Sequence, residues 1–503
     1  MAISRRYFFL GSLLAGAIPS GGYGTIPSLK AMGYKPYYDK LNVAAVGCGG
    51  RGEAILDEAA KTENIVALCD VDDQRAARAF SNYSKQPKYK DFRVMLDKQW
   101  REIDAVTIGI PDHMHATVAL ACMKANKHVY LEKPLTRTPW EARLMADAAS
   151  KYAVATQMGN QGYSHEAIRV AGEILWSGEI GDVTEVHASS SPGTHPVGLT
   201  AMPKETAVPS SLDWDLWLGG AQMRSYNPTY TPYNWRGYFD FGTGQLGNWG
   251  IHVLGPVNLA LQLGAPTSVE LLRQGDSSNW TYPMRAVLKY DFPARGAMPP
   301  VSVYWHDSAL PGEDEAYQVP GMDGEAILPR SGNLGYKGRG PEPRERSGGS
   351  RRPRTGPPQG AGGPGVDVYN WERRSVGTEP GVLSSNGAVF VGSKGLMTTV
   401  ERGEGVQLLP AERWKDYDLP PELLTRSPGH MMDWIRFCKG GERSCSHFGI
   451  AGPFTEWVVL GAIAFRVPGK KLEWDSANLR FTNSEEANQY VKPQFREGWE
   501  LKL

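Results

Sequence analysis

Apolar residues in the N-terminal third of the chain form short continuous runs that alternate with longer helix-like stretches. The runs cover residues 43–46, 65–69, 105–110 and 128–131, and helix-like stretches such as 116–125 and 140–152 lie between them. Strand-like runs separated by helical stretches are typical of β-α-β units and a parallel sheet. Runs without polar alternation fit strands that are covered on both faces. The pattern predicts an α/β fold whose first domain, residues 41–157, is a doubly wound parallel sheet.

The rhythm changes beyond residue 157. A helix is predicted over 165–177, and strand-like runs follow at 183–189, 268–273, 286–292, 301–306 and 387–395. These segments predict an α+β second domain, residues 158–503, around a largely antiparallel, open sheet. Two late apolar helices, 431–439 and 454–466, are expected to pack inside it. Because an open sheet face is a surface on which two copies can associate, we expect a homo-oligomer.

Two further segments fit neither domain. Residues 1–40 contain Arg5 and Arg6 followed by an apolar, small-residue run, which resembles a twin-arginine export signal. The apolar run is shorter than a bilayer-spanning helix, so we expect no integral membrane anchor. Because of this export signal, the expected location of the protein is the periplasm or another exported compartment.

Residues 332–365 are rich in Gly, Pro and Arg and predict a disordered insertion.

Composition narrows the classes of partner. The 503 residues include 54 basic and 54 acidic side chains, and this balance does not favour a polyanion, so we expect no nucleic-acid partner. The five cysteines are odd in number and form no Cys-x-x-Cys pair, which predicts buried thiols rather than disulfides. Because the ten histidines form no His-Glu-x-x-His arrangement, we also expect no metal site.

A glycine-rich turn follows the first strand-like run. It contains Gly-x-Gly-x-x-Gly, and Asp70 ends the second run 18 residues after the last glycine. Such glycines permit a tight turn, close approach of a pyrophosphate and close helix packing, and the acid holds a ribose 2′-hydroxyl. A carboxylate at that position favours NAD over NADP. The predicted cofactor-binding residues of this turn are Gly47, Gly49, Gly50, Arg51 and Gly52.

A second candidate group follows the fourth run, where Glu132, Lys133 and Pro134 come at the carboxyl edge of the predicted sheet. Doubly wound folds bind their ligands at this edge. A lysine facing a nicotinamide can move the proton of a substrate hydroxyl if burial or a nearby positive charge lowers its pKa. Pro134 can fix the chain through a cis bond. The alternative is an ordinary Glu-Lys pair on the surface.

The glycine motif, Pro111-Asp-His-Met-His115 and Glu132-Lys133-Pro134 occur in an order and spacing that resemble the Gfo/Idh/MocA family of sugar oxidoreductases. The resemblance implies a Rossmann domain, a C-terminal α/β domain with an open antiparallel sheet, and a substrate site between them. It places Pro111 and His115 near the nicotinamide, Glu132 near the ribose and Lys133 at the catalytic centre.

The stretch 244–256 resembles the family segment that supplies an Asp and a His to the substrate. His252 aligns with that His and is predicted to reach across the cleft toward Lys133, either as its proton partner or as a ligand of a substrate hydroxyl. Asn248 stands where many family dehydrogenases carry Asp, and Asn cannot accept a proton. Asn248 and Trp249 are counted among the substrate-binding residues. The alternative is that His252 is a satisfied core histidine.

Further polar and aromatic residues complete the candidate site. Asn160 and Gln161 are predicted to bind sugar hydroxyls, and Tyr163 to donate a proton as a third catalytic residue. Trp235 and Arg236 supply the aromatic face and the bidentate donor that sugar clefts use. The alternative for residues 157–165 is a polar helix start.

Three functions remain open. The first is an NAD-dependent oxidoreductase acting on a sugar, sugar acid or glycoside by hydride transfer. The second is an NAD-dependent glycosidase that oxidises the sugar transiently, eliminates the aglycone and reduces the product again. The segment from Ile251 to Val257 is close to a pattern of such glycosidases, and an exported enzyme benefits from a cofactor that recycles in place. The third is a sugar- or nucleotide-binding protein without catalysis.

Overall fold

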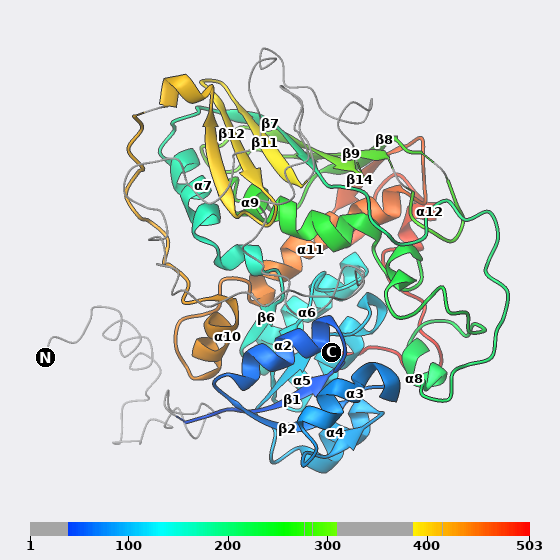
Figure 1. Cartoon of the computed structure of the whole chain (residues 1–503). Helices are drawn as coiled ribbons and strands as arrows, with labels where there is room; N and C mark the ends of the chain where they lie inside the picture. Colours follow the sequence, from blue (N-terminus) through cyan, green and yellow to red (C-terminus); the bar gives the residue numbers. More distant parts are fainter. Residues whose placement is uncertain (1–38, 276, 284, 309–385, 415) are drawn as a thin grey trace, which may run out of the picture.

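The computed structural model describes residues 39–275, 277–283, 285–308, 386–414 and 416–503, which form two domains (Figure 1). The predicted insertion at 332–365 and all but the last two residues of the predicted export segment lie outside these ranges. None of the helices in the described part is long and apolar enough to cross a membrane. The cysteines, as expected, are all unpaired.

The first sheet is parallel throughout. Its strand order is β3 (Lys88–Tyr89), β2 (Asn64–Cys69), β1 (Asn42–Val46), β4 (Ala105–Ile108), β5 (His128–Leu131) and β6 (Thr156–Met158). Its helices are α2 (Arg51–Ala60), α3 (Asp73–Asn82), α4 (Phe92–Gln99), α5 (His115–Lys124) and α6 (Pro139–Tyr152). The strand order reverses between β1 and β4, which opens a crevice at the carboxyl ends of these strands.

Alternate residues of β1 enter two different cores. Ala44 and Val46 pack in the larger hydrophobic core, whereas Val43 and Ala45 pack in a smaller one. Both faces of the sheet are therefore covered, which explains why the strands are apolar without alternation. Of the predicted strands in this domain, only 105–110 differs clearly, since β4 ends two residues earlier at Ile108.

The second domain is built on a nine-stranded sheet. Its order is β13 (Gly405–Leu409), β12 (Leu396–Val400), β11 (Gly387–Gly392), β7 (Val183–Ser189), β10 (Val301–Asp307), β9 (Ala286–Phe292), β8 (Ser268–Arg273), β14 (Lys471–Asp475) and β15 (Arg480–Phe481). Only β7 and β10 pair in parallel, so the sheet is mixed but largely antiparallel. Helices α7 (Glu166–Trp176), α9 (Ile251–Ala260) and α11 (Phe448–Ala464) lie between it and the first domain (Figure 1).

The late helices tie the two domains together. Met431, Trp434 and Ile435 of α10 (His430–Cys438) are buried in the smaller core of the first domain. Helix α11 packs along α6 and begins at Phe448, six residues before the predicted start. Pro453 lies inside α11, beside Gly452, where an added Cβ would lie 2.8 Å from the Cβ of Ala146 on α6. Burial of this apolar helix outweighs the cost of an internal proline, about 3 kcal/mol.

Candidate active site

A cavity of about 1970 Å³ lies between the domains at the carboxyl ends of the first sheet. It extends from Gly47 and Asp70 past Lys133 to His252 and Arg402, so both domains line it. Pockets for single small molecules measure roughly 300–1,000 Å³. The cavity therefore has room for an extended ligand such as a dinucleotide together with a second molecule.

The glycine-rich turn joins β1 to α2 at one end of the cavity. Gly47 has a φ of 82°, and a Cβ on Gly52 would lie 2.1 Å from the Gly47 carbonyl oxygen. Gly47 and Gly50 line the cavity, whereas Gly49 and Gly52 lie behind them. No side chain caps the N-terminus of α2, so its N–H groups are open to an anion. The bare backbone and the open helix end fit the pyrophosphate of a dinucleotide.

Asp70 follows β2 and faces the same end of the cavity. One carboxylate oxygen accepts the Cys48 N–H at 2.7 Å, and the other accepts the Asp72 N–H at 2.9 Å. Burial raises the pKa of Asp70 to about 6, although both hydrogen bonds oppose this rise. The carboxylate is therefore held in a fixed orientation by main-chain groups, as recognition of a ribose hydroxyl requires.

An ion pair crosses the middle of the cavity. Arg51, the first residue of α2, donates through Nε to Glu132 Oε1 at 2.8 Å. The Glu132 side chain is 6% exposed and that of Arg51 47%. Gln161 lies beside the same carboxylate, with its Nε2 3.5 Å from Glu132 Oε1. Three residues predicted from separate motifs therefore meet at one place.

Lys133 occupies the wall of the cavity, beyond Glu132. The Lys133–Pro134 peptide bond is cis. The ammonium Nζ donates to the main-chain oxygen of Asn248 at 2.7 Å and to its Oδ1 at 3.0 Å. Burial, followed by the charge of Arg236, lowers the pKa of Lys133 to about 7. Lys133 is therefore a cleft residue that can hold or release a proton near neutral pH, unlike a lysine in an ordinary surface pair.

His252 faces the cavity from the first turn of α9. A single π-helical turn, η4 (Leu246–Gly250), precedes this helix and carries Asn248 and Trp249 into the cavity wall. In the described structure His252 Nδ1 is buried and has no hydrogen-bond partner. Burial, together with the nearby charge of Lys133, lowers the pKa of His252 well below 6.5. The imidazole is thus neutral, and its buried Nδ1 is left without a partner among the described residues.

Aromatic residues hold Arg236 at the same end of the cavity. Arg236 belongs to η3 (Asn234–Gly237), and its guanidinium carbon lies 4.3 Å from the ring centre of Tyr233 and 4.2 Å from that of Trp235. All three residues line the cavity. Trp235 and Arg236, both predicted to bind the sugar, therefore line the cavity, and the guanidinium lies over the Trp235 ring.

Besides Gly49 and Gly52, three of the predicted site residues do not line the cavity. The Tyr163 side chain is 2% exposed, and its hydroxyl accepts a hydrogen bond from Asn258 Nδ2 at 2.8 Å inside the second domain. Asn160 is 1% exposed and its Oδ1 accepts from Ser446 Oγ. His115 contacts the carbonyl oxygens of Pro134 and Ile110 at 2.7 and 2.9 Å, so it supports the loops beneath the site. The catalytic prediction for Tyr163 and the binding prediction for Asn160 are corrected accordingly, because packing turns both side chains into the core.

Sequence reasoning missed Arg402. It comes from the turn between β12 and β13, and its guanidinium carbon lies 5.0 Å from the ring centre of Trp249. Its Nη1 is 3.4 Å from Glu404 Oε1. The local sequence, Glu-Arg-Gly-Glu-Gly, is that of an ordinary charged turn. Only pairing of strands across the large sheet brings this turn to the cavity.

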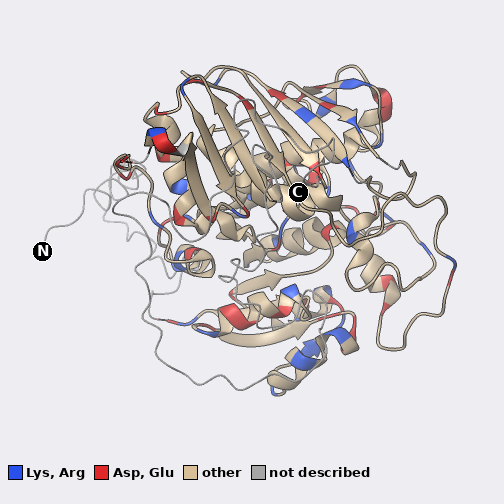
Figure 2. Cartoon of the chain, turned by 45° about the horizontal axis from the view of Figure 1, so that its top comes forward, with Lys and Arg blue, Asp and Glu red and all other residues tan. Residues whose placement is uncertain are grey.

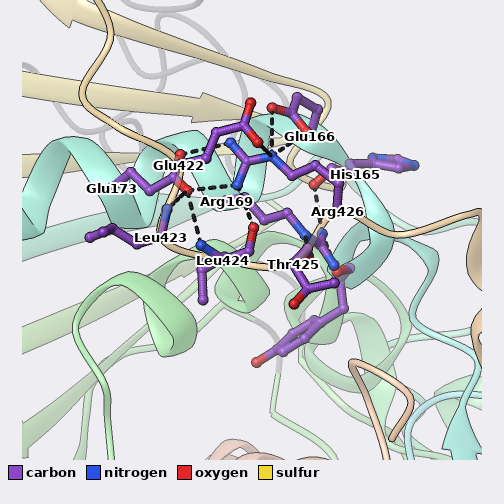
Figure 3. A network of polar contacts seen from close by, with 10 residues as sticks. His165, Glu166, Arg169, Glu173, Glu422, Leu423, Leu424, Thr425 and Arg426 are labelled. Atoms are coloured by element: carbon purple, nitrogen blue, oxygen red, sulfur yellow. Dashed lines mark hydrogen bonds and ion pairs between the residues drawn. The ribbon is translucent and has the colours of Figure 1, made fainter. Parts of the chain in front are cut away.

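The segment before α10 was also missed, and it forms part of the cavity wall. Arg426 donates to both carboxylate oxygens of Glu173 on α7, at 2.6 and 2.8 Å (Figure 3). Main-chain N–H groups of Leu423 and Leu424 point to the same carboxylate. Burial alone favours a higher pKa for Glu173, but the hydrogen bonds from Arg426 and the two N–H groups bring it below its usual value. This network holds the wall segment on α7.

Basic and acidic residues are distributed over both domains (Figure 2). Within the ranges that the structure describes, no group of three His, Cys, Asp or Glu residues is placed to hold a metal ion.

Two family models match the chain. Residues 41–160 match the oxidoreductase family with an NAD-binding Rossmann fold, and residues 187–288 match the C-terminal alpha/beta domain of an oxidoreductase family. The two matches fall on the two sheets described above and leave the segment between them, residues 161–186, to the start of the second domain.

Curated relatives match over limited regions. Inositol 2-dehydrogenase of Salmonella typhimurium is 31% identical over 152 residues, covering 29% of this chain and 45% of that protein. Levoglucosan dehydrogenase of Pseudarthrobacter phenanthrenivorans is 28% identical over 116 residues, covering 23% and 29%. A glycosyl hydrolase family 109 protein of Shewanella amazonensis is 31% identical over 169 residues, covering 29% and 37%. The matched region spans less than half the length of each of these relatives.

Solved structures share the fold over most of the chain. An inositol dehydrogenase homologue from Azotobacter vinelandii, complexed with NADH and myo-inositol, has a TM-score of 0.51 and 15% identity over 88% of this chain and all of that one. The WlbA dehydrogenase from Bordetella pertussis, in complex with NADH and UDP-GlcNAcA, has a TM-score of 0.53 and 12% identity over 87% and 99%. The two matched regions, residues 41–160 and 187–288, therefore belong to the domains of the Gfo/Idh/MocA family of oxidoreductases.

Proposed function

We propose that the protein is an NAD-dependent oxidoreductase acting on a sugar, sugar acid or glycoside. The observation that carries this proposal is the position of Lys133. Its ammonium lies in a cavity that also contains the dinucleotide turn, and its pKa is lowered to about 7. A lysine tuned in this way can act as general base or acid near neutral pH.

The chain's own residues have distinct tasks in this reaction. Lys133 removes the proton of a substrate hydroxyl, while His252, which lines the same cavity, contacts a neighbouring hydroxyl and orients the sugar. Asn248 holds the Lys133 ammonium in place through two oxygen contacts. When bound, NAD supplies the acceptor for the hydride. Asp70 favours NAD over NADP, because its carboxylate would repel a 2′-phosphate.

The second candidate is a glycosidase that uses NAD without net redox change. It is favoured by the likeness to the glycosyl hydrolase family 109 protein and by Asn248, which leaves Lys133 and His252 without an acidic partner at that position. In this reaction Lys133 would exchange the same proton in both directions, so its position serves either chemistry.

One experiment separates these functions. The purified protein is denatured and the released nucleotide measured, and the native protein is then assayed on sugars and nitrophenyl glycosides with and without added NAD. Formation of NADH from a free sugar supports the oxidoreductase. Release of nitrophenol with retained NAD and no net NADH supports the glycosidase. Absence of both activities, with binding of sugar intact, supports a binding protein.

We also propose that residues 1–40 direct export by the twin-arginine route and that the protein acts as a homo-oligomer. Replacing Arg5 and Arg6 by lysine should retain the protein in the cytoplasm, as measured by fractionation of cells. Light scattering of the purified protein gives its mass in solution, and a monomeric mass contradicts the second part.

A further inference from the structure

The cationic side chains around Lys133 differ in their partners. Arg51 is paired with Glu132 at 2.8 Å, and Arg426 is paired with Glu173 at 2.6 Å. Arg402 has a longer contact with Glu404, at 3.4 Å. Arg236, by contrast, has no carboxylate oxygen within 4.0 Å anywhere in the described chain. Of these four arginines, Arg236 is therefore the one without an ionic partner among the described residues.

The surroundings of Arg236 hold its guanidinium in a fixed place but provide no carboxylate to pair with it. Its hydrogen bonds within the described chain go to the main-chain oxygen of Tyr233, with Nη1 at 3.1 Å. The rings of Tyr233 and Trp235 cover the guanidinium, which orients the planar group. Asp112 interacts electrostatically with Arg236 but forms no ion pair with it, and its Oδ2 accepts a hydrogen bond from Thr243 at 2.7 Å.

A partly buried cation without a counter-ion is costly, because the low dielectric of the site does not replace the lost hydration. The cost falls when a ligand brings a negative charge. A guanidinium held flat against aromatic rings presents its remaining N–H groups as a fork, and this fork matches the two oxygens of a carboxylate or phosphate.

We propose that Arg236 binds an anionic group of the substrate, so that the enzyme acts on acidic sugars, carboxylates or phosphates, rather than on neutral ones. Arg236, Lys133 and Asn248 all line the large cavity, so an anion bound to Arg236 would lie in the same site as the reacting hydroxyl. The inference rests on the proposed sugar site, and it narrows the substrate class within it.

The test uses the full-length protein loaded with NAD and measures binding by calorimetry at constant ionic strength. The probes are matched pairs: D-glucuronate and D-galacturonate against D-glucose and D-galactose, D-gluconate against D-glucitol, and D-glucose 6-phosphate against D-glucose. The variants are R236Q and R236K, with R101Q as the matched control at an exposed arginine outside the cavity. Thermal unfolding and NAD content establish that each variant is folded.

We expect at least one acid or phosphate to bind about ten-fold or more tightly than its neutral counterpart. R236Q should abolish this preference, R236K should retain part of it as a point charge, and R101Q should keep it whole. Carboxylate and phosphate are distinguished by which pair shows the preference. A panel without any such preference, or a preference unchanged in R236Q, overturns the proposal. If R236Q does not fold, R236K decides alone, because an unreduced preference there contradicts bidentate binding.

Failure of this inference is distinguishable from failure of the proposed function. Lys133-dependent formation of NADH from a neutral sugar would support the proposed oxidoreductase activity and contradict the proposed anion site. Tight, Arg236-dependent binding of an acid, with neither formation of NADH nor release of an aglycone, would support the anion site and contradict the proposed catalytic function.

Discussion

Lys133 of the first domain and Asn248 of the second are in direct contact, with Nζ 2.7 Å from the main-chain oxygen and 3.0 Å from Oδ1. The contact joins the end of β5 to the π-helical turn before α9. An amide oxygen orients the ammonium without adding a full negative charge, so the pKa of Lys133 stays near 7. The relative position of the two domains thus sets the chemistry of this lysine.

Replacing Lys133 with methionine should remove proton transfer and leave the dinucleotide turn intact. We expect kcat to fall by about 10²- to 10⁴-fold, the usual contribution of a general acid or base. NAD released on denaturation should remain at the wild-type level. Full activity in K133M would contradict both catalytic candidates, and a loss of bound NAD would show that the effect is structural.

The activity should depend on pH through Lys133. In the oxidation direction the neutral amine is the base, so kcat/KM should rise as pH increases through about 7. In N248D a carboxylate lies beside the ammonium and raises its pKa, and the rise should move to higher pH by about one unit or more. N248A, which adds no charge and keeps the main-chain contact, is the control. Profiles of N248D and wild type that coincide would exclude Lys133 as the titrating group.

Gly52→Ala should disrupt the dinucleotide site. The added Cβ would lie 2.1 Å from the Gly47 carbonyl oxygen, so either the turn or α2 must move. We expect the bound NAD to be lost and the thermal midpoint to fall. Gly264→Ala is the matched control, since no atom lies within 4 Å of its added Cβ and its φ is not positive. Equal NAD content in both variants would contradict the assigned role of the turn.

Arg426→Met should destabilise the wall of the cavity. The Glu173 side chain is fully buried, and breaking a buried pair leaves an uncompensated charge. Urea unfolding should give a loss of about 3 kcal/mol, together with a higher KM for any substrate found. Lys61→Gln breaks an exposed pair with Glu58 and should cost less than about 1 kcal/mol. Equal losses in the two variants would mean that burial of Glu173 does not matter.

The local sequence pattern predicted the bounds of strands correctly where the environment of each residue follows from its neighbours in sequence. The strands at 183–189, 268–273 and 286–292 coincide with β7, β8 and β9, because apolar runs bounded by turn residues have few alternatives. It failed at α11, which begins six residues before the predicted start and packs on α6 through Gly452.

The candidate site divides in the same way. The fold class, the glycine turn with Asp70 and the candidate Lys133 could be predicted from the chain alone, because they depend on spacing within one or two elements. His252 was predicted from the resemblance of residues 244–256 to a family segment. The tertiary structure decided that Lys133 meets Asn248, that Arg402 enters from the β12–β13 turn, and that Tyr163 and Asn160 face the core. These contacts join residues more than a hundred positions apart or depend on side-chain packing, which no local pattern specifies.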